Sequence, residues 1–213
     1  TGCKVVVVTM GPPPAEGMLR ELLAMGADEA VLFSGREFGG SDTFATSQIL
    51  AAAVKKIGID EGDIVMCGRQ AIDGDTAQVG PQIAEHLNLP VISYAEELRI
   101  DGDSVIVKRQ YEDRYHELKV KMPCLVTALS ELNVPRYMTP GGIFDAYDEK
   151  EVTVWGRNDL KDLDDANIGL NGSPTKIAKA SDKVRKGAGE KVTLDATESV
   201  SYIMGKLKEK HVI

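Results

Sequence analysis

The chain has 213 residues, of which 43% are hydrophobic and 27% are charged, and its formal net charge is −8. This is the composition of an ordinary globular protein with one well-buried domain and room for an extension. The acidic balance argues against nucleic acid as a partner, because nucleic acid binding is driven by basic patches. No apolar run approaches the roughly 20 residues that a membrane-spanning helix needs.

The three cysteines, Cys3, Cys67 and Cys124, are far apart in the sequence and have no spacing typical of a metal site or a redox motif. Each lies in an apolar run that resembles a strand, which favours buried free thiols. Reduced thiols are typical of the cytoplasm, and we expect a cytoplasmic protein.

The first part of the chain alternates between apolar runs and segments with apolar residues at helical spacing. Strands are predicted at 4–10, 29–33, 63–67 and 90–93, and helices at 15–25, from Asp42 to about 57, and at 76–87. Such alternation predicts a parallel sheet with right-handed crossovers and helices on both faces.

After residue 93 the alternation of strands and helices ends, and strands joined by short connections follow. Strand-like segments at 97–100, 104–111 and 115–121 are joined by turn residues, which is typical of antiparallel hairpins. Two more strands are predicted at 124–129 and 151–155. The predicted fold class is therefore α/β, with an open, mainly parallel nucleotide-binding sheet, an antiparallel hairpin insertion and a C-terminal arm.

The last quarter of the sequence has a different composition. From Gly156 to about Asp195, Asp, Lys, Gly and Asn dominate, and such a segment cannot build a core of its own. A stripe of apolar residues at helical spacing follows, formed by Val200, Ile203, Met204 and Leu207. A short helix is marginal alone, so it must pack on something. We expect an α/β domain over 1–155 and an extended arm over 156–213.

The segment 68–81 is the strongest candidate for a binding site. It follows a buried strand and leads into a predicted helix, and ligands of open parallel sheets bind beyond the carboxyl ends of the strands. The free N–H groups of a helix start suit a phosphate. Gly74 lets the backbone approach a ligand, and Thr76 and Gln78 offer hydrogen bonds. The alternative, an ordinary helix capped by Asp75 or Thr76, is equally compatible with these residues.

A second candidate loop begins with Met10 and Gly11 at the end of the first strand. Its backbone could hold an adenine ring, with Met10 packed on it; the alternative is a rigid turn from strand to helix. Neither a GxGxxG fingerprint nor a Walker lysine loop occurs in the sequence.

Catalytic residues and metal ligands are not indicated. The histidines His86, His116 and His211 are isolated, and no nucleophile has an adjacent base. The acidic cluster Asp159, Asp162, Asp164 and Asp165 is more typical of a solvated face than of a metal site. Any redox chemistry would need a cofactor.

Several motifs together resemble one family over essentially the whole chain. They are 8–12 (VTMGP), 24–28 (AMGAD), 68–80 (GRQAIDGDTAQVG), 121–128 (KMPCLVTA) and 135–137 (PRY). In this order they resemble the β-subunit of electron-transfer flavoproteins. His116 departs from the pattern, since it stands where the family usually has an acidic or amide residue.

The resemblance implies a nucleotide-binding subunit that forms a heterodimer with an α-subunit. It also implies that the C-terminal arm of this chain packs on the α-subunit. It further implies an upstream strand, which this chain is expected to lack. The implied cofactor-binding residues are Met10, Gly11, Ala71, Gly74, Asp75, Thr76, Ala77, Gln78, Val79 and Gly80.

The segments 74–81 and 136–146 are similar to the electron-bifurcating branch of bacterial members. This branch holds FAD and takes a hydride from NADH. One electron goes to ferredoxin or flavodoxin, and the other goes through the α-subunit FAD to a partner dehydrogenase. The resemblance assigns docking of the dehydrogenase to a loop with Met138, Ile143 and Phe144. The alternative is a member that only shuttles electrons and holds structural AMP.

Overall fold

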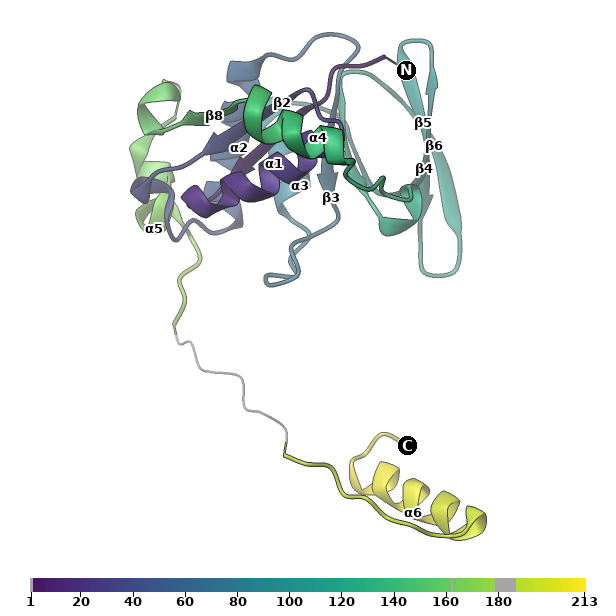
Figure 1. The fold of residues 1–213 in the computed structure, drawn as a ribbon. Coiled ribbons are helices and arrows are strands. Elements are labelled where there is room, and N and C mark those ends of the chain that lie inside the picture. Colours follow the sequence, from purple (N-terminus) through teal and green to yellow (C-terminus); the bar gives the residue numbers. More distant parts are fainter. Residues whose placement is uncertain (1, 162, 179–186) are drawn as a thin grey trace. The chain divides into compact units, whose positions relative to one another are not determined.

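The computed structural model describes residues 2–161, 163–178 and 187–213. The chain forms two compact units, Thr1–Lys176 and Ile177–Ile213. Figure 1 shows the elements of both units, and each unit is considered by itself.

The described part of the first unit contains eight strands in two sheets. They are β1 (Val6–Met10), β2 (Glu29–Phe33), β3 (Ile64–Gly68), β4 (Val91–Asp101), β5 (Ser104–Gln110), β6 (Tyr115–Lys121), β7 (Cys124–Ala128) and β8 (Val152–Trp155). One sheet has the order β1-β2-β8 and the other β3-β7-β4-β5-β6. Neighbours are parallel except in the β4-β5 and β5-β6 pairs. The predicted α/β class is confirmed, although its strands form two sheets, because alternation along the chain fixes strand direction but not adjacency.

The described residues also contain six α-helices and several short helical turns; α1 to α4 lie between strands, and α5 and α6 follow the last strand. The α-helices are α1 (Glu16–Ala24), α2 (Thr43–Ile57), α3 (Val79–Leu87), α4 (Pro140–Phe144), α5 (Gly169–Gly172) and α6 (Ala196–Glu209). The 3-10 turns are η1 (Pro13–Ala15), η2 (Arg36–Phe38), η3 (Ser130–Leu132), η5 (Arg157–Asp159) and η6 (Asp165–Asn167), and η4 (Asp145–Glu149) is a π-helical turn.

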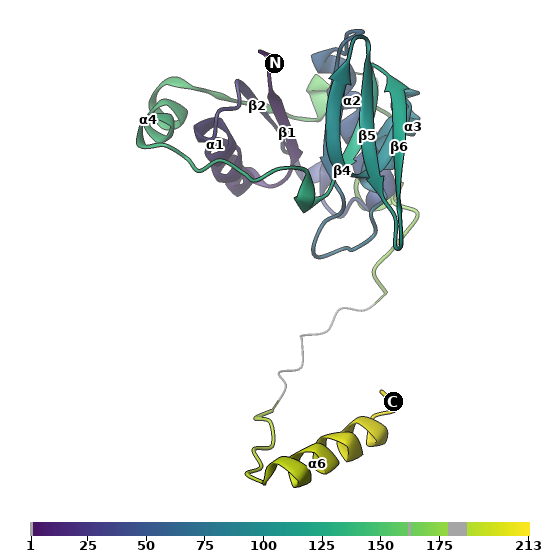
Figure 2. The same cartoon turned by 90° about the vertical axis from the view of Figure 1, so that its right-hand side faces the viewer.

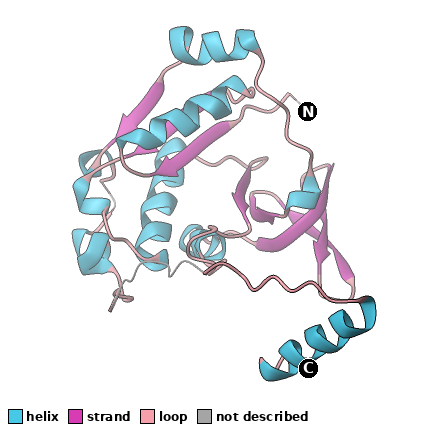
Figure 3. Ribbon diagram, turned by 60° about the horizontal axis from the view of Figure 1, so that its bottom comes forward, coloured by secondary structure: helices cyan, strands magenta, loops and turns pink. Residues whose placement is uncertain are grey.

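Helices cover both faces of the β1-β2-β8 sheet (Figure 3). Because successive side chains of a strand point to opposite faces, Leu32 of β2 packs with α1, and Phe33 packs with α2. The buried residue Ala51 of α2 belongs to a different cluster, with Leu125 of β7. Helix α2 is therefore packed against both sheets and joins them into one unit.

Strand β4 is longer than predicted, because the expected strands at 90–93 and 97–100 are one element. Its pairing register shifts between Ile92 and Ala95, and Tyr94 has a left-handed backbone with φ of 62°. The strand thus leaves β7 and continues into the hairpin with β5 and β6 (Figure 2). Val107 of β5 is buried in one cluster with Val126 of β7.

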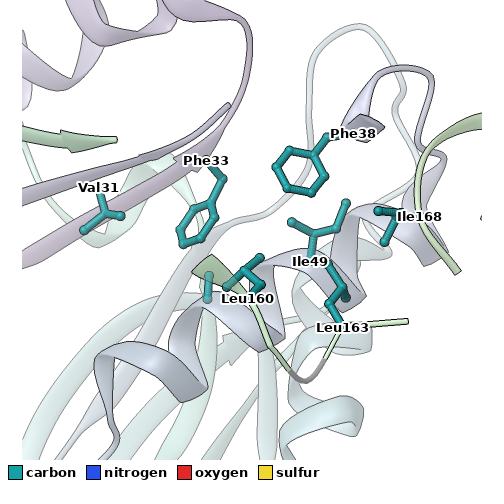
Figure 4. Close-up of a cluster of buried hydrophobic side chains, with 8 residues drawn as sticks. Val31, Phe33, Phe38, Ile49, Leu160, Leu163 and Ile168 are labelled. Atoms are coloured by element: carbon teal, nitrogen blue, oxygen red, sulfur yellow. The ribbon is translucent and has the colours of Figure 1, made fainter. Parts of the chain in front are cut away.

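Residues beyond Trp155 contribute to the core of the first unit. Leu160, Leu163 and Ile168 are buried in a cluster with Phe38 and Ile49 (Figure 4). The compact unit consequently ends at Lys176 and not at the expected boundary after residue 155. The segment is mostly polar, and for this reason its composition suggested no core. Its three buried apolar residues nevertheless pack in one cluster with residues of α2 and β2.

The second unit contains the predicted C-terminal helix. Asp195 caps α6 by accepting a hydrogen bond from the N–H of Glu198 at 2.8 Å. No residue of α6 is buried, and Val200 and Ile203 of the apolar stripe are 61% and 55% exposed. The helix therefore has a formed start and an uncovered apolar face.

The cysteines do not all lie where the sequence suggested. Cys124 is buried and Cys67 partly buried, but Cys3 is exposed, because β1 begins only at Val6. Within the described residues, no helix combines the length and the apolar character needed to cross a membrane.

Candidate functional site

The ends of β1 and β2 open onto a pocket at the carboxyl edge of their sheet. Met10 and Gly11, which the sequence analysis names as candidate binding residues, line it together with residues of the loop after β2. The pocket has a volume of about 630 Å³, within the range of small-ligand sites. Parallel strands place their carboxyl ends at one edge, which explains why these residues meet.

The segment Ser34–Ser41, which forms most of this pocket, was not predicted as part of the site. It supplies Arg36, whose guanidinium makes no ion pair within the described part of the chain. Its only sequence signal was its position directly after a buried strand. An unpaired cation in an open pocket is suited to a phosphate or carboxylate.

Helix α2 begins beside the pocket, and its first turn is already occupied by protein groups. The carboxylate of Asp42 accepts hydrogen bonds from the N–H of Ala45 at 3.1 Å and of Thr175 at 2.8 Å. Partial burial opposes ionisation of Asp42, but these hydrogen bonds, that of Thr175 first, outweigh it and lower its pKa. Ser173 accepts from the N–H of Asp42 at 2.8 Å.

Helix α3 begins at Val79 rather than at the predicted Thr76. Ala77 has a left-handed backbone with φ of 52°, which cannot continue into a right-handed helix. No side chain caps α3, so neither Asp75 nor Thr76 has the capping role considered above. The first turn of α3 thus offers backbone N–H groups without a side-chain partner.

The loop before α3 contacts the start of α2. Thr43 donates a hydrogen bond to Oε1 of Gln78 at 2.9 Å, which connects the loop to the helix that begins at the pocket. Asp75 is held within the loop, because Gln70 donates to its carboxylate and its own N–H donates to Ala71 at 3.0 Å. One hydrogen bond therefore joins the predicted loop to α2, whose start lies close in sequence to the pocket-lining Ser41.

The predicted loop residues differ in what they expose. Ala71, Gly74 and Thr76 are exposed, whereas Gly80 is buried. A Cβ atom on Gly80 would lie 2.9 Å from Cγ2 of Thr127, so this position faces the sheet. At Gly74 an added Cβ would meet no atom within 4 Å. Gly80 can offer a ligand only its backbone, while Gly74 lies open to one.

The segment assigned to docking is helical rather than a loop. Thr139 caps α4 by accepting from the N–H of Gly142 at 3.0 Å. A helix forms here because a Pro at its first turn and this cap favour it. Met138, Ile143 and Phe144 are 42%, 40% and 66% exposed, which leaves apolar side chains in contact with solvent.

Other titratable residues have local partners. Nε2 of His86 lies 3.2 Å from the hydroxyl of Ser47, and the His116 ring lies 4.6 Å from that of Tyr111. Asp164 accepts from the N–H of Ala166. Asp162 lies outside the described residues, and those described contain no group of three or more potential metal ligands.

Comparisons with known proteins agree with the motifs. The model of the electron transfer flavoprotein domain matches residues 1–159. The chain is 53% identical over 212 residues to the electron transfer flavoprotein subunit beta of Clostridium acetobutylicum, covering 100% of this chain and 80% of the relative.

Two further relatives have comparable identity. The acryloyl-CoA reductase electron transfer subunit gamma of Anaerotignum propionicum is 52% identical over 217 residues, covering 100% of this chain and 81% of the relative. The caffeyl-CoA reductase-Etf complex subunit CarD of Acetobacterium woodii is 52% identical over 213 residues, with 100% and 80% covered. This chain therefore belongs to the electron transfer flavoprotein family, among its β subunits.

Proposed function

We propose that this chain is the β subunit of a heterodimeric, electron-bifurcating flavoprotein. In this proposal it holds FAD at the carboxyl edge described above, and NADH is the donor. Electrons pass to ferredoxin or flavodoxin and, through an FAD on the α subunit, to a partner dehydrogenase. The observation that carries the proposal is the hydrogen bond of Thr43 to Gln78, which joins the first residue of α2, close in sequence to the Met10 pocket, to the residue before the uncapped start of α3.

The residues present suit a dinucleotide. The pocket offers Met10 and a glycine-rich backbone for a flat base, and Arg36 supplies a positive charge. A pyrophosphate favours the N–H groups of a helix start, and α3 lacks a side-chain cap there. Pro81 has no N–H, so Gln78, Val79 and Gly80 are the available donors at this start.

When bound, FAD would supply hydride acceptance from NADH and single-electron release. The chain itself contributes binding and orientation. Gln78 is positioned by Thr43, and the loop from Gln70 to Asp75 is closed by its own hydrogen bonds. A rigid loop holds a cofactor with a smaller loss of conformational entropy on binding.

The names of two relatives favour a partner dehydrogenase that acts on a CoA thioester. One relative is an electron transfer subunit of an acryloyl-CoA reductase, and the other is a subunit of a caffeyl-CoA reductase-Etf complex. The uncovered stripe of α6 is suited to packing on the α subunit.

The decisive experiment counts flavins per heterodimer. We expect two FAD on denaturation of the complex co-purified with its α subunit. One FAD together with AMP in the extract would instead identify a member that only shuttles electrons. The visible flavin absorbance per heterodimer gives the same distinction, because AMP is colourless and would leave a single FAD to absorb.

The docking surface can be tested separately through Ile143 and Phe144. Ala at both positions should slow electron delivery to the dehydrogenase, because exposed apolar residues are suited to an interface hot spot. NADH oxidation by an artificial dye should continue unchanged. Tyr147→Ala is a matched control of similar exposure outside α4. Wild-type rates of electron delivery to the dehydrogenase in the double variant would show that Ile143 and Phe144 are not part of the docking surface.

A further inference from the structure

Two arginines and three aromatic rings form a continuous row at the carboxyl end of β7. The guanidinium of Arg69 lies 5.4 Å from the ring centroid of Tyr94, and that of Arg109 lies 5.8 Å from the same ring. Arg109 also lies 4.9 Å from the ring of Tyr111, which is followed by His116 at 4.6 Å between ring centroids. The row has no part in the pocket described above.

The backbone places this row at the ligand-binding edge of the second sheet. The N–H of Arg69 donates to the carbonyl of Ala128 at 3.1 Å, at the end of β7. Arg109 pairs with Ala95 of β4, which in turn pairs with Ala128. Arg69 also begins the loop that leads to α3.

The two guanidinium groups are not neutralised by the chain. Neither forms an ion pair within the described residues, although the protein has a net charge of −8. Nε of Arg109 is buried without a hydrogen-bond partner, and its Nη1 has only the hydroxyl of Tyr111 at 3.4 Å. Buried polar groups are normally hydrogen-bonded, so the Arg109 guanidinium keeps donor capacity that the described residues do not use.

The row also contains a strained backbone. Tyr94 has φ of 62°, which is unusual for a bulky residue, and its N–H donates to Oγ1 of Thr127 at 3.0 Å. The Tyr94 ring lies 5.4 Å from the guanidinium of Arg69 and 5.8 Å from that of Arg109. Strained residues of this kind concentrate at binding sites.

We propose that Arg69 and Arg109 form a second anion site, which binds the diphosphate of a nucleotide ligand. The inference rests on the proposed nucleotide-binding function and adds a position beyond the start of α3. Guanidinium groups bind phosphate through paired hydrogen bonds, and the half-exposed Tyr111 offers a surface on which a base can stack. The position beside the loop before α3 favours a nucleotide over an acidic segment of a partner protein.

The test measures ADP binding to the full chain in complex with its α subunit, by isothermal titration calorimetry. The variant Arg69→Gln/Arg109→Gln should weaken ADP binding by about ten-fold per arginine. The matched control is Arg99→Gln/Arg114→Gln, which removes the same charge from arginines already paired with Glu117 and Asp113. Its affinity should stay within about two-fold of the wild type.

Two single variants guard against misfolding. Arg69 is exposed, so Arg69→Gln should fold normally and still weaken ADP binding. Arg109→Lys keeps the positive charge but loses the paired N–H donors of the guanidinium. Its affinity for ADP should lie between those of the wild type and the double variant. Unchanged ADP affinity in Arg69→Gln and in the double variant, or no ADP binding by the wild type, would overturn the proposal.

A third outcome would assign the arginines to a protein contact instead. In that case the double variant would dissociate from the α subunit, as seen by analytical ultracentrifugation, with ADP affinity unaltered. The nucleotide extracted from the wild-type complex tests the proposed function independently. Its absence would reject that function, whereas the ADP titration alone decides the role of the two arginines.

Discussion

Helices α2 and α3 begin at the carboxyl ends of β2 and β3, yet their first turns are built differently. At α2 the carboxylate of Asp42 caps the helix and also binds the N–H of Thr175. At α3 the position before the helix is Gln78, whose side chain makes no capping bond. One helix start is closed by the protein, and the other is left to solvent or a ligand.

The two helix starts occupy equivalent places in the fold, but the capped one favours stability and the uncapped one favours binding. A capped start contributes to folding, because it satisfies N–H groups that would otherwise lack partners. An uncapped start costs stability and leaves donors for an anion. The following variants test this division, beginning with the largest expected effect.

The largest effect is expected at Gly80, which faces the sheet. Gly80→Glu places a charged side chain against Thr127, and should lower the free energy of unfolding by about 3 kcal/mol or more. Chemical denaturation measures this loss. The control Gly74→Glu adds the same charge where there is open space, so it should leave stability unchanged and lower only the amount of bound nucleotide. Wild-type stability of Gly80→Glu would contradict the packing of α3 on β7.

Helix α6 is capped at its start by Asp195, like α2, but none of its residues is buried within the second unit. Ile203→Asp/Leu207→Asp should weaken association with the α subunit by about a hundred-fold, since charge would enter a dry contact. Ser201→Asp/Gly205→Asp is the control, because it adds equal charge away from the stripe. Analytical ultracentrifugation measures the affinity of both double variants for the α subunit. Equal affinities would show that the stripe is not part of the interface.

The cap of α2 should contribute a smaller amount. Asp42→Ala should lower the free energy of unfolding by about 1–2 kcal/mol, because two N–H groups lose their acceptor. Thermal unfolding of the variant measures it. Thr43→Val leaves the cap intact and serves as control, so a similar loss in both variants would argue against capping.

The same cap predicts a pH dependence. The pKa of Asp42 in the folded chain lies below its ordinary value of 3.8. Its contribution is therefore complete above that ordinary value, and it is lost as the pH falls through the lowered folded pKa. In Asp42→Asn this part of the acid sensitivity should disappear, which denaturation curves at several acidic pH values would reveal.

The smallest effect is expected at Ala77, just before α3. Its left-handed backbone disfavours Ala, so Ala77→Gly should alter the free energy of unfolding by less than about 1 kcal/mol, as relieved strain offsets the added chain entropy. If this conformation aims the loop at a ligand, bound nucleotide per chain should fall in the variant. Ala71→Gly is the matched control in the same loop. Equal nucleotide content in both variants would make the strain incidental.

Most elements followed from local sequence patterns. The apolar runs at β1, β2 and β7 and the cap of α2 at Asp42 are local signals, and the structure confirms them. The late start of α3 could not be predicted in this way. Nothing in the sequence around Ala77 indicates its left-handed backbone.

The lining of the pocket could be predicted from the sequence only in part, because much of it depends on contacts between distant segments. Met10 ends β1 and Gly11 follows it, and this position together with the family resemblance indicated a ligand there. The segment 34–41 contains no familiar motif, and its place in the pocket depends on contacts with distant residues. Ser41, for example, accepts a hydrogen bond from the N–H of Gly169.

The double packing of α2 has a consequence for hydrogen exchange. Its residues Ala51 and Ile49 are buried in different clusters, so the helix cannot open without separating the two sheets. Amides in the middle of α2 should therefore exchange with deuterium only through global unfolding of the first unit. Amides of α6, which has no buried residue, should exchange within the earliest times until a partner covers the helix. Exchange of α2 thus reports the stability of the fold, and exchange of α6 reports its assembly.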